Sequence, residues 1–105
     1  MAFRYTVSAR FEHADVAAEW VEWLRAGHCR AVLQGGAQSA TVLQLDPAES
    51  LHFEVRYDFA DRAHFRTYQD LTAPQLIAEG LERFPTSRGI QYARTTGVVA
   101  YTENL

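Results

Sequence analysis

Residues 3–12 read Phe-Arg-Tyr-Thr-Val-Ser-Ala-Arg-Phe-Glu, and hydrophobic and polar side chains alternate throughout this stretch. Successive side chains of a β-strand point to opposite faces of a sheet, so this period of two predicts a strand with one buried face. The buried set is Phe3, Tyr5, Val7, Ala9 and Phe11.

Two later stretches alternate in the same way and are joined by a turn. Asp46-Pro47 is the turn signal, because proline presets the first turn dihedral and aspartate can bond back to the turn backbone. We therefore predict an antiparallel hairpin. Its first strand, residues 38–45, has Thr41, Leu43 and Leu45 on one face; its second has Leu51, Phe53, Val55 and Tyr57.

A helix is predicted between the first strand and this hairpin. Asp15 can cap it by accepting a bond from a free backbone N–H. Gly27 is expected to end or fray it, and Gly35-Gly36 to form the following loop. The residues at helical spacing are Val16, Trp20, Trp23 and Leu24.

The second helical region is divided in two. Asp61 opens the first part, whose apolar residues are Ala63, Phe65, Tyr68 and Leu71. Thr72 starts the second part, with Pro74 in its first turn and Gln75 completing a capping box. Gly80 suggests a close approach of the backbone to a neighbour, and Pro85 stops the helix. The inward stripe of this part is Leu76, Ile77, Leu81 and Phe84.

Residues 89–101 form the last predicted strand, where a break in the alternation near Thr95-Thr96-Gly97 suggests a bulge. The order is therefore β-α-β-β-α-β. With right-handed crossovers this order predicts a ferredoxin-like α+β fold, a four-stranded antiparallel sheet with the helices on one face. We expect residues 1–105 to form one such domain.

Composition and charge narrow the partners. The formal charge is −3, and no basic run with interleaved aromatic residues overrides it, so nucleic acid is not expected to bind. Cys29 is the only cysteine, which excludes an internal disulfide. Since the N-terminus resembles no signal peptide and no segment has membrane-spanning length, we expect a soluble protein in the reducing cytoplasm, with no membrane partner.

The face of the sheet opposite the helices is left uncovered by this fold. The first and third strands make it polar, and we expect Ala40, Val42 and part of residues 98–101 to add apolar area to it. Such a mixed surface is compatible with two sheets meeting in a partly wet homodimer interface. The polar residues are Arg4, Thr6, Ser8, Arg10, His52, Glu54 and Arg56.

The run from Trp20 to His28 is the most distinctive in the chain. If the helix reaches residue 28, then Trp20, Leu24 and His28 lie at i, i+4 and i+8, and the histidine could orient a ligand or exchange a proton. The more ordinary interpretation makes the tryptophans core residues and pairs His28 with the C-terminal carbonyls of the helix.

Neither a nucleophile pair nor a metal site is predicted. Cys29 adjoins His28, but catalytic partners converge in space rather than in sequence. The four histidines, at positions 13, 28, 52 and 64, have no metal-ligand spacing. We expect no metal and no cofactor.

These residues resemble a short bacterial family known only as a domain of unknown function. The resemblance covers nearly the whole chain, although Cys29-Arg30 stands where the family usually has an apolar residue and a proline. The positions that carry it are Trp20, Trp23, His28, Val32, Leu33, Gly36, Tyr57, Phe65, Tyr68, Ala73-Pro74, Leu76, Gly80-Leu81, Phe84 and Arg94-Thr95.

The family is similar to the dimeric α/β-barrel group, in which two ferredoxin-like sheets pack face to face. That group contains cofactor-free monooxygenases, haem-degrading enzymes and proteins without known activity. The resemblance therefore implies the fold and a homodimer, but no reaction.

Three hypotheses follow, and whether the protein is an enzyme stays open among them. The first is a binding or accessory protein that holds a small, partly apolar ligand. The second is a monooxygenase-like enzyme, cofactor-free or haem-dependent, with His28 as base or axial ligand. The third is a structural or interaction module whose tryptophans serve only the core. The candidate ligand-binding residues are Trp20, Trp23, His28, Phe65 and Tyr68.

Overall fold

Strand β1 (Phe3–Phe11) lies inside a four-stranded sheet, paired with β3 (His52–Phe59) on one side and β4 (Ile90–Val98) on the other. The edge strand β2 (Ser39–Gln44) pairs with β3, so the order is β2-β3-β1-β4. All three pairings are antiparallel. The computed structural model describes residues 1–105 and confirms the predicted ferredoxin-like topology.

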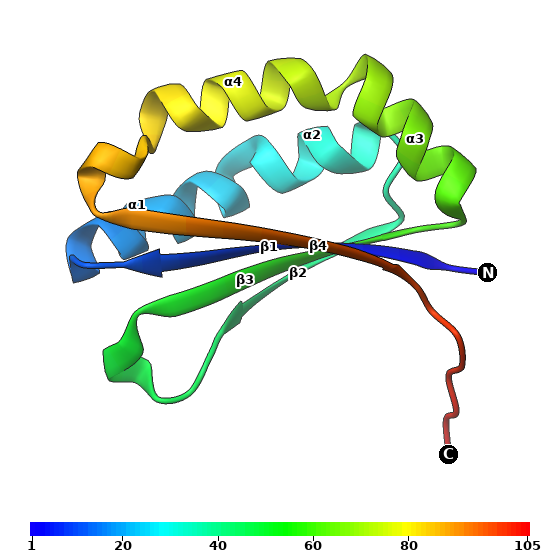
Figure 1. Ribbon diagram of the computed structural model, residues 1–105, viewed down its shortest axis with the longest axis horizontal. Coiled ribbons are helices and arrows are strands. Elements are labelled where there is room, and N and C mark those ends of the chain that lie inside the picture. Colours follow the sequence, from blue (N-terminus) through cyan, green and yellow to red (C-terminus); the bar gives the residue numbers. More distant parts are fainter.

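The helices cover one face of this sheet (Figure 1). The first helical region consists of α1 (Ala14–Trp23), a π-helical segment η1 (Leu24–His28) and α2 (Cys29–Gln34). The second consists of α3 (Arg62–Leu71) and α4 (Ala73–Arg83). Short 3₁₀ turns at Ala48–Ser50 and Thr86–Arg88 precede β3 and β4. The helices are too short or too polar for any of them to cross a bilayer.

The core lies between the helices and the sheet, and its 19 buried residues are all hydrophobic or aromatic. The pairing register of β1 with β3 forms one side of this core. Tyr5 lies opposite Tyr57 and Ala9 opposite Phe53, so these side chains share the helix-facing side of the sheet. Every strand residue predicted to be buried in β1 except Val7 is buried, and Val7 packs against the core.

The predictions for β2 and β4 were partly wrong. Ala40 and Val42 lie opposite Tyr57 and Val55 and therefore share the helix-facing side, while Thr41 and Leu43 face away. An edge strand with apolar residues on both faces does not reveal its orientation, and only the pairing register fixes it.

Strand β4 contains no bulge, because its pairing with β1 runs unbroken from Ile90 to Val98. The alternation fades at Thr95 because from Ala93 onward the strand is solvent-exposed. Residues 99–101 lie beyond the strand, although the Val99 N–H still donates to the Ala2 carbonyl at 2.8 Å; Val98 lies opposite Phe3, on the helix-facing side.

The predicted helix starts were correct only in part. Asp61 caps α3, accepting a bond of 2.9 Å from the His64 N–H. Asp15 is not a cap, because α1 begins at Ala14 after His13; it lies in the first turn, where its charge suits the helix dipole. Thr72 makes no capping bond because its backbone is itself helical, whereas a cap needs an extended residue.

The expectation that Gly27 would end or fray the first helix was correct in part. The Gly27 backbone is not helical, with φ 167° and ψ −21°, so the helix is kinked there, but it resumes and continues as α2 to Gln34. Leu71 is 79% exposed at the junction of α3 and α4.

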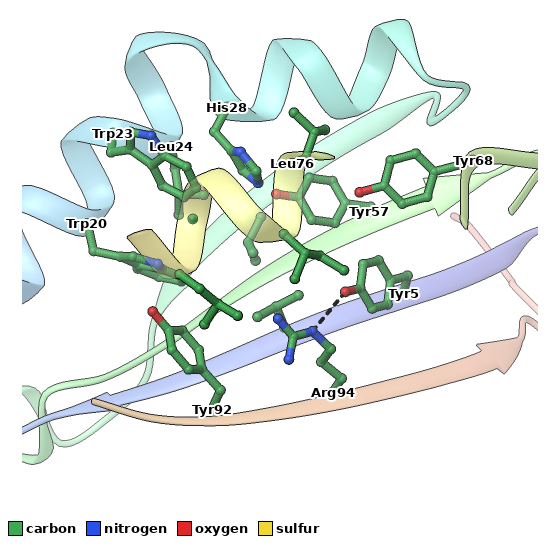
Figure 2. A pocket seen from close by; sticks show the side chains of 15 residues that line it. Tyr5, Trp20, Trp23, Leu24, His28, Tyr57, Tyr68, Leu76, Tyr92 and Arg94 are labelled. Carbon is green, nitrogen blue, oxygen red and sulfur yellow. Dashed lines mark hydrogen bonds between the residues drawn. The ribbon is translucent and has the colours of Figure 1, made fainter. Parts of the chain in front are cut away.

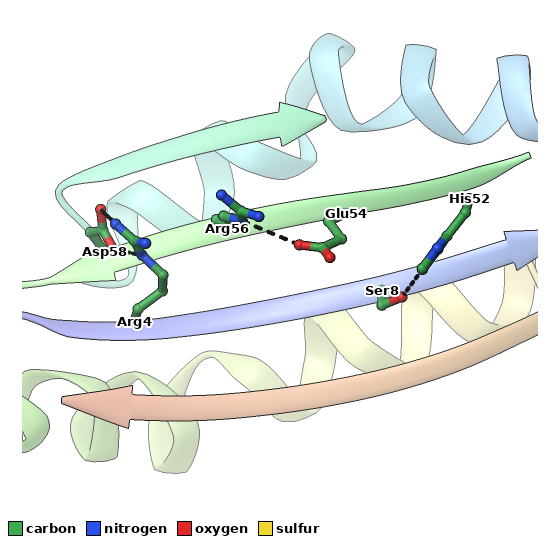
Figure 3. Close-up of polar contacts among 6 residues, drawn as sticks. All are labelled: Arg4, Ser8, His52, Glu54, Arg56 and Asp58. Carbon is green, nitrogen blue, oxygen red and sulfur yellow. Dashed lines mark hydrogen bonds and ion pairs between the residues drawn. The ribbon is translucent and has the colours of Figure 1, made fainter. Parts of the chain in front are cut away.

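Polar pairs occupy the open face of the sheet (Figure 3). Arg4 pairs with Asp58 at 2.8 Å and Arg56 with Glu54 at 3.2 Å. Ser8 Oγ lies 2.6 Å from His52 Nε2. These six polar side chains therefore pair with one another within the chain.

Candidate functional site

A cavity lies between the sheet and helices α1 and α4 (Figure 2). Its volume is about 60 Å³, and about 530 Å³ when the open solvent at its mouth is included. Twelve of its fifteen lining residues are hydrophobic. They are Tyr5, Val7, Trp20, Trp23, Leu24, His28, Val55, Tyr57, Tyr68, Leu76, Ile77, Gly80, Leu81, Tyr92 and Arg94.

The π-helical segment shapes one wall of this cavity. The Cys29 N–H bonds back to the Leu24 carbonyl, five residues earlier instead of four. In an α-helix, two residues five apart point about 140° away from each other, because each residue turns the helix by about 100°. The long Cys29–Leu24 bond and the non-helical Gly27 backbone within it instead bring His28 onto Trp23, with ring centroids 4.0 Å apart. Such segments are frequent at functional sites.

Gly80 allows α4 to approach this stack. A Cβ atom at position 80 would lie 3.2 Å from the nearest carbon of the Trp23 indole, closer than most side-chain contacts. The predicted close backbone approach at Gly80 is therefore confirmed, and the residue it meets is Trp23.

The His28 imidazole is neutral at physiological pH. Burial lowers its pKa from the ordinary value of 6.5 to about 4, and the Glu79 carboxylate opposes this shift without cancelling it. Neither ring nitrogen bonds to a protein atom. A neutral imidazole offers one donor and one acceptor, so the ring can do both toward a molecule in the cavity.

Two tyrosines add hydroxyl groups to the same space (Figure 2). Tyr57 is 1% exposed, and its hydroxyl contacts only the Cys29 sulfur, at 3.9 Å. Tyr68 is 4% exposed, yet its hydroxyl has no protein partner and is not sealed from solvent. Burial raises the pKa of both, that of Tyr68 to about 12, so both hydroxyls keep their protons.

Arg94 lies at the mouth, on the helix-facing side of β4. Its Nε donates a bond of 3.1 Å to the Tyr5 hydroxyl, and its guanidinium lies 5.9 Å from the centre of the Tyr92 ring. Tyr92 in turn donates to the Phe84 carbonyl at 2.8 Å, which joins β4 to the end of α4.

The structure brings together four of the five residues predicted to bind a ligand. Trp20, Trp23, His28 and Tyr68 line the cavity, whereas Phe65 does not. Phe65 packs in the core against Phe3, at 4.8 Å between ring centroids. The ligand-binding role of the four remains a prediction.

Sequence reasoning missed Tyr5, Tyr57, Tyr92 and Arg94 as members of this site. The three tyrosines were assigned to strands, but their hydroxyl ends were not considered. Arg94 escaped notice because the expected bulge obscured the face on which it lies. Arg94 faces the helices because it lies opposite Val7 in the unbroken pairing of β4 with β1, and only this pairing reveals its direction.

Cys29 and the histidines offer no second site. Burial raises the pKa of the Cys29 thiol, and a protonated thiol is a poor nucleophile. No three His, Cys, Asp or Glu side chains lie together in a geometry that could hold a metal ion.

The comparisons agree with this architecture. The family model of a domain of unknown function, DUF4286, matches residues 4–95. No curated protein sequence matches the chain.

Several solved structures share the fold at low identity. A dimeric ferredoxin-like protein from an uncultured marine organism is 10% identical, with a TM-score of 0.75 and full coverage of both chains. The cofactor-independent oxygenase SnoaB of Streptomyces nogalater is 14% identical, with a TM-score of 0.71 over 96% of this chain and 95% of its own. A Streptomyces coelicolor monooxygenase in complex with nanaomycin D is 15% identical, with a TM-score of 0.67 over 98% and 93%.

Proposed function

This chain belongs to the DUF4286 family of unknown function, and we propose that it binds a small, partly apolar molecule in the cavity beneath α4, as a homodimer. Of the five ligand-binding residues proposed from the sequence, the proposal keeps the four that line the cavity, which are Trp20, Trp23, His28 and Tyr68.

One observation carries the binding proposal. Polar atoms without protein partners, on His28, Tyr68 and Arg94, meet in one otherwise aromatic and aliphatic cavity. Water can still reach the Tyr68 hydroxyl and the Arg94 guanidinium, and polar groups placed in an otherwise apolar pocket are suited to orienting a ligand.

The homodimer is supported by the uncovered face of the sheet and by the dimeric ferredoxin-like protein of the same fold. A cytoplasmic location is supported by the single cysteine, Cys29, which is a free thiol.

Filling the cavity tests the binding proposal. Val7 lines the floor, so Val7→Phe should occupy the space and abolish binding of a neutral fluorescent probe, N-phenyl-1-naphthylamine. Val42→Phe is the matched control, because Val42 lies on the same side of the sheet but outside the cavity. Failure of the wild-type protein to bind the probe, or equal binding by both variants, would contradict the proposal.

A second candidate is a monooxygenase-like enzyme that oxidises an aromatic molecule with dioxygen. The observation that favours it is the neutral His28 imidazole facing the same space as two protonated tyrosine hydroxyls, which could exchange a proton with a substrate. Oxygen uptake with quinol-type compounds, lost in His28→Asn, would support it. Absence of uptake together with tight binding would leave the binding function. A haem titration with a Soret shift would identify the haem-dependent form.

A further inference from the structure

We propose that Arg94 anchors the ligand and that the ligand is an aromatic carboxylate, with its ring beneath α4 and its carboxylate at the mouth. This inference rests on the binding function proposed above and specifies the chemical class of the molecule bound.

The cavity has one positive charge and no negative one. Arg94 is the only arginine among its lining residues, and no aspartate or glutamate lines it. His28 does not add a charge, because its pKa of about 4 leaves it neutral near pH 7. The Glu79 carboxylate acts on His28 from outside the lining, so the guanidinium of Arg94 is the one charged group that a ligand in the cavity can contact.

Arg94 also lacks a counter-ion elsewhere. The chain forms four arginine–carboxylate pairs within 4.0 Å, and Arg94 takes part in none of them. Its one protein hydrogen bond, from Nε to the Tyr5 hydroxyl, uses one of the five N–H donors of a guanidinium. The four donors on its terminal nitrogens remain for a ligand.

The guanidinium is held in place for such a contact. Tyr5 is 8% exposed and fixes Nε, and the Tyr92 ring lies beside the planar group. An oriented, planar guanidinium matches a carboxylate through two parallel hydrogen bonds, which a flexible ammonium cannot reproduce. Figure 2 shows Arg94 extending from β4 toward the space between Tyr5 and Tyr92.

The rest of the cavity suits a flat ring. Trp20, Trp23, Tyr57 and Tyr68 present aromatic surface on the inner side, and Leu76 closes it from α4. A ligand with its ring inside and its charge at the exposed Arg94 keeps the carboxylate close to water. This arrangement avoids the large cost of burying an unpaired charge.

The test compares two probes of nearly the same shape, 2-naphthoate and the neutral 2-naphthamide, by isothermal titration calorimetry near neutral pH. The wild-type protein should bind naphthoate about 10- to 100-fold more tightly than naphthamide, the usual strength of a hydrogen-bonded ion pair. Arg94→Gln should remove this preference, so that naphthoate and naphthamide bind with similar affinities. Arg94→Lys should restore only part of it, because the charge returns without the planar group.

Arg30→Gln is the matched control, since Arg30 is an exposed residue of α2 outside the cavity. It should retain the full preference. Equal wild-type affinities for the two probes would overturn the inference even if Arg94→Gln failed to fold, and the binding function would stand. If neither probe nor the neutral fluorescent compound bound, both proposals would fall.

Discussion

At the scale of single residues, His28 shows how position determines chemistry. The sequence places it only five residues after Trp23, where an α-helix would point the two side chains apart. The π segment stacks them instead, and the resulting burial keeps the imidazole neutral. His28 lines the cavity, and neither of its ring nitrogens has a protein hydrogen-bond partner.

This neutral imidazole makes stability depend on pH. Because the pKa is about 4 in the folded chain and 6.5 when exposed, the unfolded chain binds the extra proton first as pH falls. The stability that a neutral His28 allows is thus complete above about pH 6.5 and is lost as pH falls toward 4. Urea unfolding should show this loss in the wild type, and His28→Asn should show a shallower fall over the same window.

A direct titration provides the check. The ring protons of His28, followed by NMR, should shift with a midpoint near pH 4. A midpoint near 6.5 would mean that the imidazole is hydrated, and the cavity geometry described here would then be incorrect.

At the scale of elements, the two helical regions meet at Gly35, directly after α2. A Cβ atom there would lie 2.7 Å from Thr72 Cγ2 and 2.9 Å from Tyr68 Cδ1. Thr72 and Tyr68, at the junction of α3 and α4, therefore pack directly against the backbone of Gly35. Helix α4 itself buries only Ala73, and Ile77 and Leu81 remain partly exposed at the mouth of the cavity. Its other contacts are those of Leu76 with the core and of Gly80 with the Trp23 indole.

We expect Gly35→Ala to destabilise the protein by about 1–3 kcal/mol, the usual cost of forcing extra atoms into a packed contact. Gly97→Ala is the control, because a Cβ atom there meets nothing within 4 Å. It should be neutral or stabilising by about 0.5–1 kcal/mol, since glycine in a strand interior is unfavourable. Urea denaturation of the two variants would measure the difference, and equal effects would contradict the close contact at Gly35.

At the scale of the whole molecule, the sheet has one covered and one open face (Figure 1). The open face has fixed pairs of opposite charge, Arg4 with Asp58 and Arg56 with Glu54. A second copy can meet such a face without leaving an isolated charge, because each pair is neutral as a unit. We therefore place the proposed dimer interface there.

Thr6 lies near the middle of this face, opposite both Arg56 and Thr95. Thr6→Glu should weaken dimerisation about tenfold or more (~1.4 kcal/mol), because Arg56 is already paired with Glu54 and the new carboxylate adds an uncompensated charge to the interface. Gln34→Glu adds the same charge on exposed α2 and should leave the dimer intact. Sedimentation equilibrium would measure the dimer dissociation constants of both variants. Equal constants would mean that the interface is not on this face, and a monomeric wild-type protein would contradict the homodimer.

Periodicity predicted most of the fold. The alternation in β1 and β3 determined which side chains are buried. A strand has only two faces, so when the polar side chains face water the apolar ones must face the core. The cap at Asp61 and the approach at Gly80 also followed from local chemistry. Four of the five candidate residues line the cavity. They could be selected from the sequence because tryptophan, histidine and tyrosine combine a large apolar surface with a polar group.

Other features depend on contacts between residues far apart in the chain. The orientation of β2 needs its register with β3, since both of its faces are partly apolar. The stack of Trp23 on His28 needs a backbone bond pattern that composition does not reveal. Arg94 joins Tyr5 across 89 positions, and only the pairing of β1 with β4 brings them together. The sequence by itself therefore determined the layers of this protein, through local hydrophobic patterning, and the tertiary structure decided the cavity, through the packing of distant strands and helices.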